Sequence, residues 1–197
     1  VSAASSQGAP ISSIVELTPF SSLESMAYLK EGIPGGNESD LASLGESLGH
    51  HPMALSQAVG YINHTPAMEI GTYISLFNHN KEAFWNGEQK ALHGQTLLHT
   101  SLRMSLSKLQ QECPESYETL CFLAMCDTQH LAKSLVNQWF VHTTGGDMGA
   151  FTQLIARSFV AGASGEGADN SFSVHGYLRD VLLSEASMEL KQKTATR

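Results

Sequence analysis

Apolar side chains recur every three or four residues over most of the chain, and this spacing predicts amphipathic helices. In the first half, the apolar positions with this spacing are Leu41, Leu44, Leu48, Leu55, Ala58, Val59, Ile62, Ile70, Tyr73, Ile74 and Phe77. The pattern predicts four short helices, each with one apolar face. Helices of this kind bury their apolar faces against one another, so we expect a small helical bundle.

Local start and stop signals divide the first half into these helices. Ser21 and Glu24 match a capping box, which predicts a helix start. Gly49 is placed to end the second helix in the left-handed conformation, and Pro52 suits the first position of the third. We interpret Thr65-Pro66 as the start of the fourth helix. Upstream, residues 14–17 form a short strand-like run.

The helical spacing is interrupted and then resumes. Residues 78–95 are polar and contain glycines, so we expect a connector with a short helical piece near residues 81–85. A long helix is predicted from Leu98, Leu102, Leu106 and Leu109, and Pro114 starts the next one. Two more helices are predicted, one over about residues 132–140 and one carrying Phe151, Leu154 and Ile155.

The spacing changes near the C-terminus. Residues 158–162 and 171–175 are short β runs around the Gly-rich segment 163–170, which predicts a hairpin. A last helix is expected over about residues 176–190. Helices followed by a hairpin are typical of a winged-helix domain. The predicted fold is mostly α: a small helical bundle over 21–95, followed by a winged-helix domain with a short β-hairpin over 96–197.

Composition narrows the classes of function. The 197 residues are 42% hydrophobic and 15% charged, which is typical of a globular chain. The 11 basic and 19 acidic residues give a net charge of -8, which disfavours nonspecific nucleic-acid binding. The longest apolar run, residues 120–126, is far shorter than the about 20 residues of a membrane span. No secretory signal is visible, so we expect a cytoplasmic protein with no nucleic-acid or membrane partner.

Cysteine usage agrees with an intracellular protein. Cys113, Cys121 and Cys126 are odd in number, and two of them lie within an apolar helical pattern. We expect buried, reduced thiols. Because no CxxC pair exists, a cysteine zinc site is not expected.

Several motifs for catalysis are missing. The chain contains no G-x-x-x-x-G-K-[ST], no H-E-x-x-H and no G-x-S-x-G. The Gly-rich run 162–167 lacks a basic residue and opens no helix, so we interpret it as a hairpin loop and not as a phosphate loop. We therefore expect that the chain is not an enzyme by itself.

The segment Leu48–Leu55 is the first candidate for ligand binding. A helix N-terminus exposes unpaired N–H groups, and Pro52 favours that geometry. Such a turn can pack against a purine ring and offer donors to a ligand. The alternative is an ordinary turn between helices with solvent-facing histidines. A metal site at His50 and His51 is disfavoured, because adjacent side chains diverge.

His175 is the second candidate, since it lies where the predicted hairpin ends and the last helix begins. An imidazole at that position can donate a hydrogen bond to a phosphate oxygen, and its protonation would respond to that anion. The alternative is a capped, partly buried histidine without a ligand.

In this order, the segments resemble the C-terminal part of the NB-ARC module of STAND-class NTPases. The resemblance covers nearly the whole chain. The matching segments are residues 4–7 and 15–20 (the end of the nucleotide-binding sheet), 48–55 ("G-L-P-L-A-L"), 101–109 (the helix that enters the winged-helix subdomain) and 174–176 ("M-H-D").

The resemblance implies ADP or ATP as cofactor, with cofactor-binding roles for Pro52, His175 and Gly49. Pro52 would pack near the adenine of ADP, and His175 would contact the β-phosphate. Exchange of ADP for ATP would rotate the winged-helix subdomain and allow assembly. The chain would then be the regulatory half of a signalling switch.

The resemblance also implies partners. Residues 1–20 would be the end of a nucleotide-binding domain, whose P-loop and magnesium-binding acid would lie upstream of Val1. We therefore expect this chain alone not to bind nucleotide tightly and not to hydrolyse ATP. A downstream repeat domain and self-association on activation are further expectations.

Two positions depart from the family pattern. Gln7 stands where an arginine often senses the γ-phosphate, and Gly176 replaces the aspartate of "M-H-D". Direct sensing of ATP through position 7 and the orientation of His175 are therefore open.

Three alternatives from other classes also remain open. A helical adaptor would bind a protein through an apolar face, and an independent hydrolase would need a site that no motif indicates. A winged-helix DNA binder would need basic residues on residues 149–158, where Arg157 stands alone, and on the loop 163–170, which has none.

Overall fold

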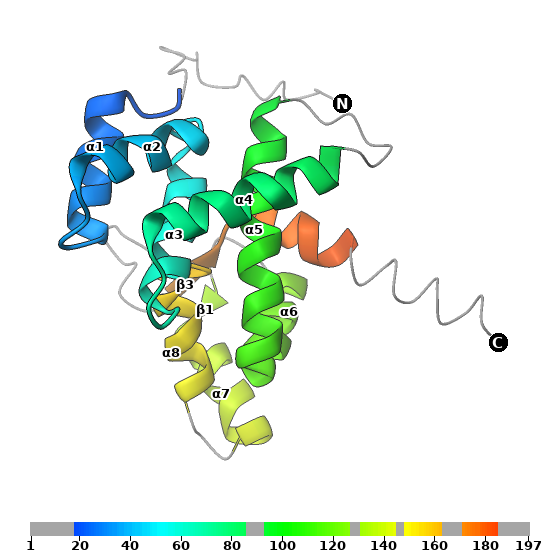
Figure 1. Ribbon diagram of the computed structural model, residues 1–197. Helices are drawn as coiled ribbons and strands as arrows, with labels where there is room; N and C mark the ends of the chain where they lie inside the picture. Colours follow the sequence, from blue (N-terminus) through cyan, green and yellow to red (C-terminus); the bar gives the residue numbers. More distant parts are fainter. Residues whose placement is uncertain (1–17, 86–92, 127–130, 145–147, 163–170, 185–197) are drawn as a thin grey trace, which may run out of the picture.

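The computed structural model describes residues 18–85, 93–126, 131–144, 148–162 and 171–184. They form a mostly helical fold with a small antiparallel sheet (Figure 1). The helices are α1 (Ser22–Gly32), α2 (Glu38–Ser47), α3 (Pro52–Asn63), α4 (Ile70–Trp85), α5 (His93–Glu112), α6 (Pro114–Met125), α7 (Lys133–Thr144) and α8 (Gly149–Ala156). The strands are β1 (Leu131–Ala132), β2 (Val160–Gly162) and β3 (Ser171–Val174), and residues 176–184 form a further helix. The strand expected at 14–17 lies outside the described residues.

The first three helices begin and end where the local signals predicted. Ser21 Oγ accepts a hydrogen bond from Glu24 N at 3.3 Å, and Ser21 N donates to the Glu24 carboxylate at 2.8 Å. Gly49 follows α2 with φ +60°, in the left-handed region. Its N–H donates to the Glu46 carbonyl, and that of His50 donates to the Gly45 carbonyl, both at 3.0 Å. These paired bonds complete the end of α2.

The fourth helix begins later than predicted. The expected start at Thr65-Pro66 is wrong, because Ala67 has φ +56° and Met68 N donates to the Thr65 carbonyl. These residues form a turn, and α4 starts at Ile70. The connector expected from residue 78 is also corrected: α4 continues to Trp85, and α5 begins at residue 93. Polar residues there mark the exposed side of a helix, as at Asn80, and not a loop.

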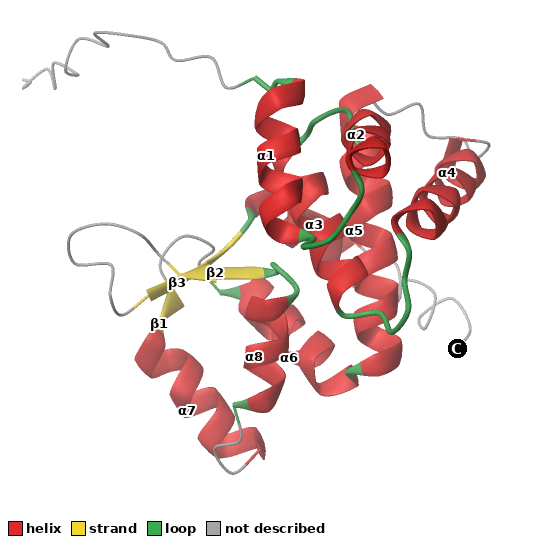
Figure 2. Cartoon of the chain, turned by 60° about the vertical axis from the view of Figure 1, so that its left-hand side comes forward, coloured by secondary structure: helices red, strands yellow, loops and turns green. Residues whose placement is uncertain are grey.

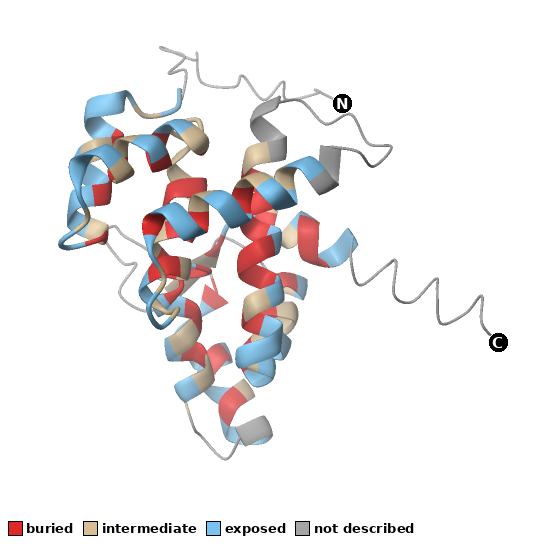
Figure 3. Ribbon diagram, in the orientation of Figure 1, coloured by how far each residue is buried: buried red, intermediate tan, exposed pale blue. Residues whose placement is uncertain are grey.

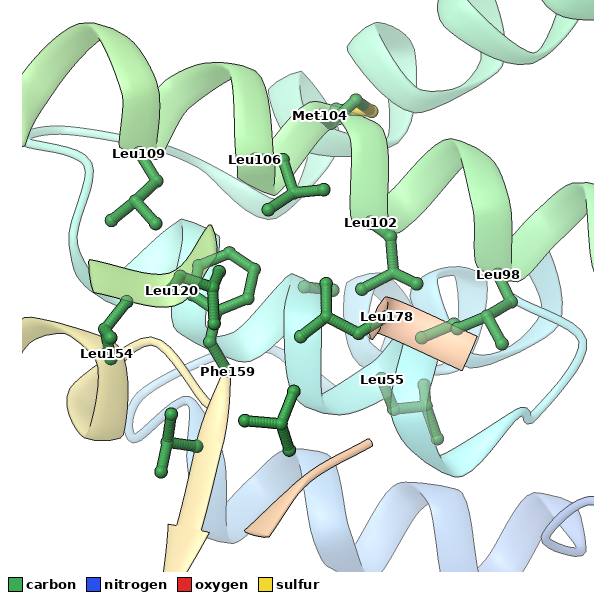
Figure 4. Close-up of a cluster of buried hydrophobic side chains, with 14 of the residues drawn as sticks. Leu55, Leu98, Leu102, Met104, Leu106, Leu109, Leu120, Leu154, Phe159 and Leu178 are labelled. Carbon is green, nitrogen blue, oxygen red and sulfur yellow. The ribbon is translucent and has the colours of Figure 1, made fainter. Parts of the chain in front are cut away.

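Helix α5 is the centre of the molecule, since it packs against α3, α4 and α6. Figure 3 shows buried positions along α5 and in the elements around it. In Figure 4, the side chains of Leu98, Leu102, Leu106 and Leu109 gather with those of Leu55, Leu120, Leu154, Phe159 and Leu178. One hydrophobic core therefore joins the helices of the N-terminal half to the hairpin region.

The sheet has the strand order β1-β3-β2, with both pairs antiparallel. The predicted hairpin is confirmed: Val160 pairs with Val174 and Gly162 with Phe172. Figure 2 shows the sheet beside α8, with α7 leading away from it. Strand β1 was not predicted, and the helix expected from residue 132 begins at residue 133, because Ala132 pairs with Ser171.

Two smaller expectations change with the packing. Phe151 and Leu154 of α8 are buried, but Ile155 is 44% exposed, so the predicted apolar face is narrower than expected. Among the described residues the three cysteines form no disulfide, and they are half-buried and not fully buried as expected. Within the described parts of the chain, no helix has the length and apolar character needed to cross a membrane.

Candidate functional site

The start of α3 lacks a side-chain cap among the described residues, and we call such a helix start open. His51 is its N-cap residue and Pro52 its first residue, and the His51 side chain makes no capping hydrogen bond within the described residues. The first backbone N–H groups of a helix have no partner inside the helix. At this start they consequently lack the usual side-chain acceptor, which favours a negatively charged group nearby.

The two adjacent histidines before α3 face different partners. His50 Nδ1 lies 2.9 Å from Ser25 Oγ, and the His50 carbonyl accepts a hydrogen bond from Phe20 N at 3.0 Å. His51 instead interacts electrostatically with His175. The Nδ1 atom of His51 is buried and has no hydrogen-bond partner among the described residues. His50 therefore has a structural role, because its hydrogen bonds hold this turn. The Nδ1 atom of His51 has no such role among the described residues.

His175 caps the helix 176–184. Its Nδ1 accepts a hydrogen bond from Tyr177 N at 3.2 Å, and its carbonyl accepts one from Arg179 N at 3.1 Å. An imidazole nitrogen that accepts a hydrogen bond carries no proton, so the neutral ring has its proton on Nε2. The side chain is exposed, which leaves that N–H able to donate. The alternative of a capped, partly buried histidine fits only in part, because His175 takes part in a cap but its side chain is exposed.

The two candidate segments lie close enough for charge to act between His51 and His175. Burial lowers the pKa of His51, and the neighbouring His175 imidazole lowers it further through charge repulsion. His51 precedes one helix and His175 another, and a helix start carries partial positive charge. An anion near either helix start would be favoured by this partial charge.

Gly49 has a structural explanation without a ligand. Its φ of +60° suits glycine, and a Cβ there would come within 2.9 Å of Leu97 Cδ1 on α5. Gly49 also lies two residues before His51, so it shapes the turn that presents the start of α3. Its assignment as a cofactor-binding residue stays a prediction.

Gly176 leaves open space after His175. A Cβ built on Gly176 meets no atom of the described residues within 4 Å. An acidic side chain at this position would fit, so its replacement by glycine is not explained by crowding. Nδ1 of His175 is held by Tyr177 N, as described above, without an acidic neighbour at position 176.

Sequence reasoning missed the contacts that hold the last helix in place. Tyr177 Oη lies 3.3 Å from His99 Nδ1 on α5, and Arg179 Nε donates to the Ala124 carbonyl at 3.0 Å. Burial raises the pKa of Tyr177, and Asp180 adds to this rise. Burial and the charge of Arg103 lower the pKa of His99. The only signal for these contacts in the sequence was His99, which follows the inward-facing Leu98 of a predicted helix.

Arg157, the one base on the candidate DNA-recognition helix, is engaged inside the protein. It is 8% exposed, and its guanidinium lies 3.1 Å from the Glu112 carboxylate. Arg157 therefore does not present its charge to a phosphate backbone in this arrangement. This contact weakens the DNA-binding alternative.

A small hollow between α1 and α2 has a volume of about 60 Å³ and includes Ser25, Glu46 and His50. Pockets for drug-sized ligands are about 300 Å³ or larger, so this one is too small for a nucleotide. The described residues contain no group of three histidine, cysteine or acidic side chains arranged to hold a metal ion.

Comparison with known proteins adds no relative: the chain matches no protein-family model, no curated protein and no solved structure at a significant level.

Proposed function

We propose that this chain is the regulatory, ADP/ATP-responsive half of a STAND-type signalling switch, located in the cytoplasm. The observation that carries the proposal is that His51, at the uncapped start of α3, lies close enough to His175 for the charge of His175 to lower the pKa of His51, in addition to the larger effect of burial. These segments are far apart in the sequence, and the resemblance implies that both contact the same nucleotide. Their proximity is what a shared ligand requires.

The element order supports the same proposal. From α6 onward, the chain runs through helix, strand, two helices and two strands, with β1 beside β3. This is the order expected of a winged-helix subdomain. The hairpin ends directly at His175, so the position of the hairpin determines the position of the histidine.

The chemistry at this site is hydrogen bonding to an anion and its release. The N–H groups at the start of α3 and the Nε2–H of His175 would donate to the ligand, with Pro52 packed near the base. An upstream nucleotide-binding domain would supply the P-loop and the magnesium ion. Release of ADP would free the winged-helix region to rotate and permit self-association.

The test uses the intact protein that contains this chain. Nucleotide released by denaturation is identified by ion-exchange chromatography, and the expected species is ADP. His175→Asn keeps a capping acceptor but removes the imidazole donor. A hydrogen bond to a charged group contributes about 1.5–3 kcal/mol, so ADP release is expected to be about tenfold faster or more.

The matched control is Lys30→Gln, which removes an ion pair between the exposed side chains of Lys30 on α1 and Glu38 on α2. Its release rate is expected to equal that of the wild type. An intact protein without bound nucleotide, or an unchanged release rate in His175→Asn, contradicts the proposal.

A helical adaptor remains the second candidate because of one surface feature. Phe122 and Trp139 stack with their ring centroids 3.7 Å apart and are only half-buried, and Met125 is 67% exposed. An exposed apolar surface of this kind is typical of protein interaction sites. Sedimentation of the wild type and of Met125→Ser at micromolar concentration tests self-association through this surface.

A further inference from the structure

We propose that Gln57 and Gly60 are positioning residues, which hold the turn after α8 on α3 and thereby fix β2, β3 and His175 relative to α3. Both residues lie on α3, whose N-cap is His51, about 1.7 and 2.5 turns beyond it. The inference rests on the proposed function, because His175 is the proposed phosphate contact. Nothing in the sequence patterns indicated either residue.

Gln57 is a buried polar residue whose side chain forms a hydrogen bond to the turn after α8. Its side chain is 1% exposed, and Nε2 donates to the Ser158 carbonyl at 3.0 Å. Its Oε1 is buried without a partner among the described residues, which costs free energy. A methionine would fill similar space without that cost. The amide is therefore explained by the turn that it holds.

Gly60 allows the backbones of α3 and the turn to touch. A Cβ on Gly60 would lie 3.0 Å from the Arg157 carbonyl oxygen and 3.2 Å from the Arg157 Cα. Gly60 lies inside a helix, where any residue adopts the backbone conformation and alanine is favoured. Close approach, and not conformation, explains the glycine.

The turn leads directly to His175. Ser158 has φ +60°, and two hydrogen bonds complete the end of α8: Ser158 N to the Ile155 carbonyl at 3.0 Å and Phe159 N to the Leu154 carbonyl at 2.9 Å. Strand β2 begins at Val160, two residues after the contact with Gln57. Val160 pairs with Val174, and His175 follows.

Helix α3 thus carries the contacts to the turn and, at its N-cap, His51. His51 stands at its start, and Gln57 lies about 9 Å further along the axis at the rise of a regular helix. A rigid helix and a rigid antiparallel pair leave little freedom between the held turn and His175. Displacing the turn is expected to move His175 away from His51.

The experiment measures the electrostatic coupling between the two histidines in the 197-residue chain. The pKa of His51 is followed by NMR in the wild type and in His175→Asn, which keeps the cap but carries no titrating charge. The difference between the two values is the coupling. In the wild type, His175→Asn is expected to raise the pKa of His51 toward its usual value.

The same pair of measurements is then made in a Gly60→Ala background. The added methyl group is expected to displace the turn by a few tenths of an ångström, and we expect the coupling to differ from that of the wild type. Gly71→Ala is the matched control, because a Cβ at this exposed helical position meets nothing within 4 Å among the described residues. Coupling is expected to be unchanged there. A loss of stability alone leaves the coupling in the folded state unchanged, so this readout separates positioning from a structural role.

Gln57→Met provides a second route if Gly60→Ala does not fold, since it removes the hydrogen bond at similar volume. Its coupling is also expected to differ from that of the wild type. Coupling that is unchanged in a folded Gly60→Ala or in Gln57→Met overturns the inference, as does a wild type in which His175→Asn leaves His51 unchanged. No nucleotide takes part in this measurement. Failure of the proposed function would instead appear as an intact protein without ADP.

Discussion

Two helices of the N-terminal half begin in opposite ways. Helix α1 begins closed, because Ser21 and Glu24 each satisfy a backbone N–H of the other. Helix α3 begins open, because Pro52 follows a histidine whose side chain caps nothing among the described residues. Both starts carry strong signals in the sequence. A sequence can therefore predict where a helix starts even when no side chain caps its first backbone N–H groups. Only an uncapped start leaves those N–H groups available to a ligand.

Gly49→Ala is expected to have the largest effect, since it disturbs the turn that presents the open start. Alanine at φ +60° costs about 1–2 kcal/mol, and its methyl group would crowd Leu97. We expect the free energy of unfolding, measured by urea titration, to fall by about 2 kcal/mol or more. The control Gly71→Ala, in open space on α4, is expected to leave stability equal or slightly higher. Equal stability of the two variants would contradict this explanation of Gly49.

Ser21→Ala opens the closed start of α1. Loss of an N-cap serine costs about 1 kcal/mol, so a decrease of that size is expected in the free energy of unfolding. The backbone N–H of Ser21 and, to a smaller extent, its hydroxyl hold the pKa of Glu24 below its usual value, so loss of the hydroxyl should raise that pKa part of the way. Ser22→Ala is the control, since Ser22 is the exposed first residue of α1 and not its cap. A similar loss in both variants would show that the cap does not stabilise α1.

His51→Asp closes the open start of α3. An aspartate at the N-cap accepts backbone hydrogen bonds and complements the helix dipole, so we expect a gain of about 0.5–1 kcal/mol. In the intact protein, the added negative charge should weaken ADP retention. His64→Asp places the same residue at the C-cap of α3 and is expected to destabilise the chain. A destabilised His51→Asp would show that the start of α3 is not open in solution.

The smallest expected effect is the pH dependence of the open start. Burial lowers the pKa values of His51 and His99 in the folded state, so between those values and about 6.5 the unfolded chain binds more protons. The free energy of unfolding is therefore expected to be highest above about pH 6.5 and to fall as pH decreases below it. His51→Asn should reduce this slope. A slope that His51→Asn leaves unchanged would remove His51 from the explanation.

Much of the local structure was predictable because the signals are local. The capping box at Ser21, the left-handed Gly49 and the first-position Pro52 each act on atoms a few residues away. The hairpin followed equally from two β runs around a glycine-rich segment. The wrong start at Thr65-Pro66 has the same origin: proline is compatible with a turn as well as with a helix start, and the φ of Ala67 decides between them.

The candidate site was only half predictable. Pro52 and His175 were identified as separate candidates, each beside a helix start. No pattern showed that His51 and His175 would interact, because that depends on where α3 and the hairpin lie relative to each other. The role of Gln57 could not be predicted for the same reason. From the sequence, a glutamine in a helical pattern is interpreted as a surface residue, and only the fold shows that a carbonyl of another element accepts its hydrogen bond.

The sequence by itself therefore determined the helices, their caps and the hairpin, because backbone conformation and capping are decided among neighbours along the chain. Tertiary structure alone decided the short strand β1, the burial of Arg157 against Glu112 and the effect of the His175 charge on the pKa of His51. Pairing, burial and charge interaction depend on distances between elements. Those distances are set when the core around α5 packs, and no local pattern contains them.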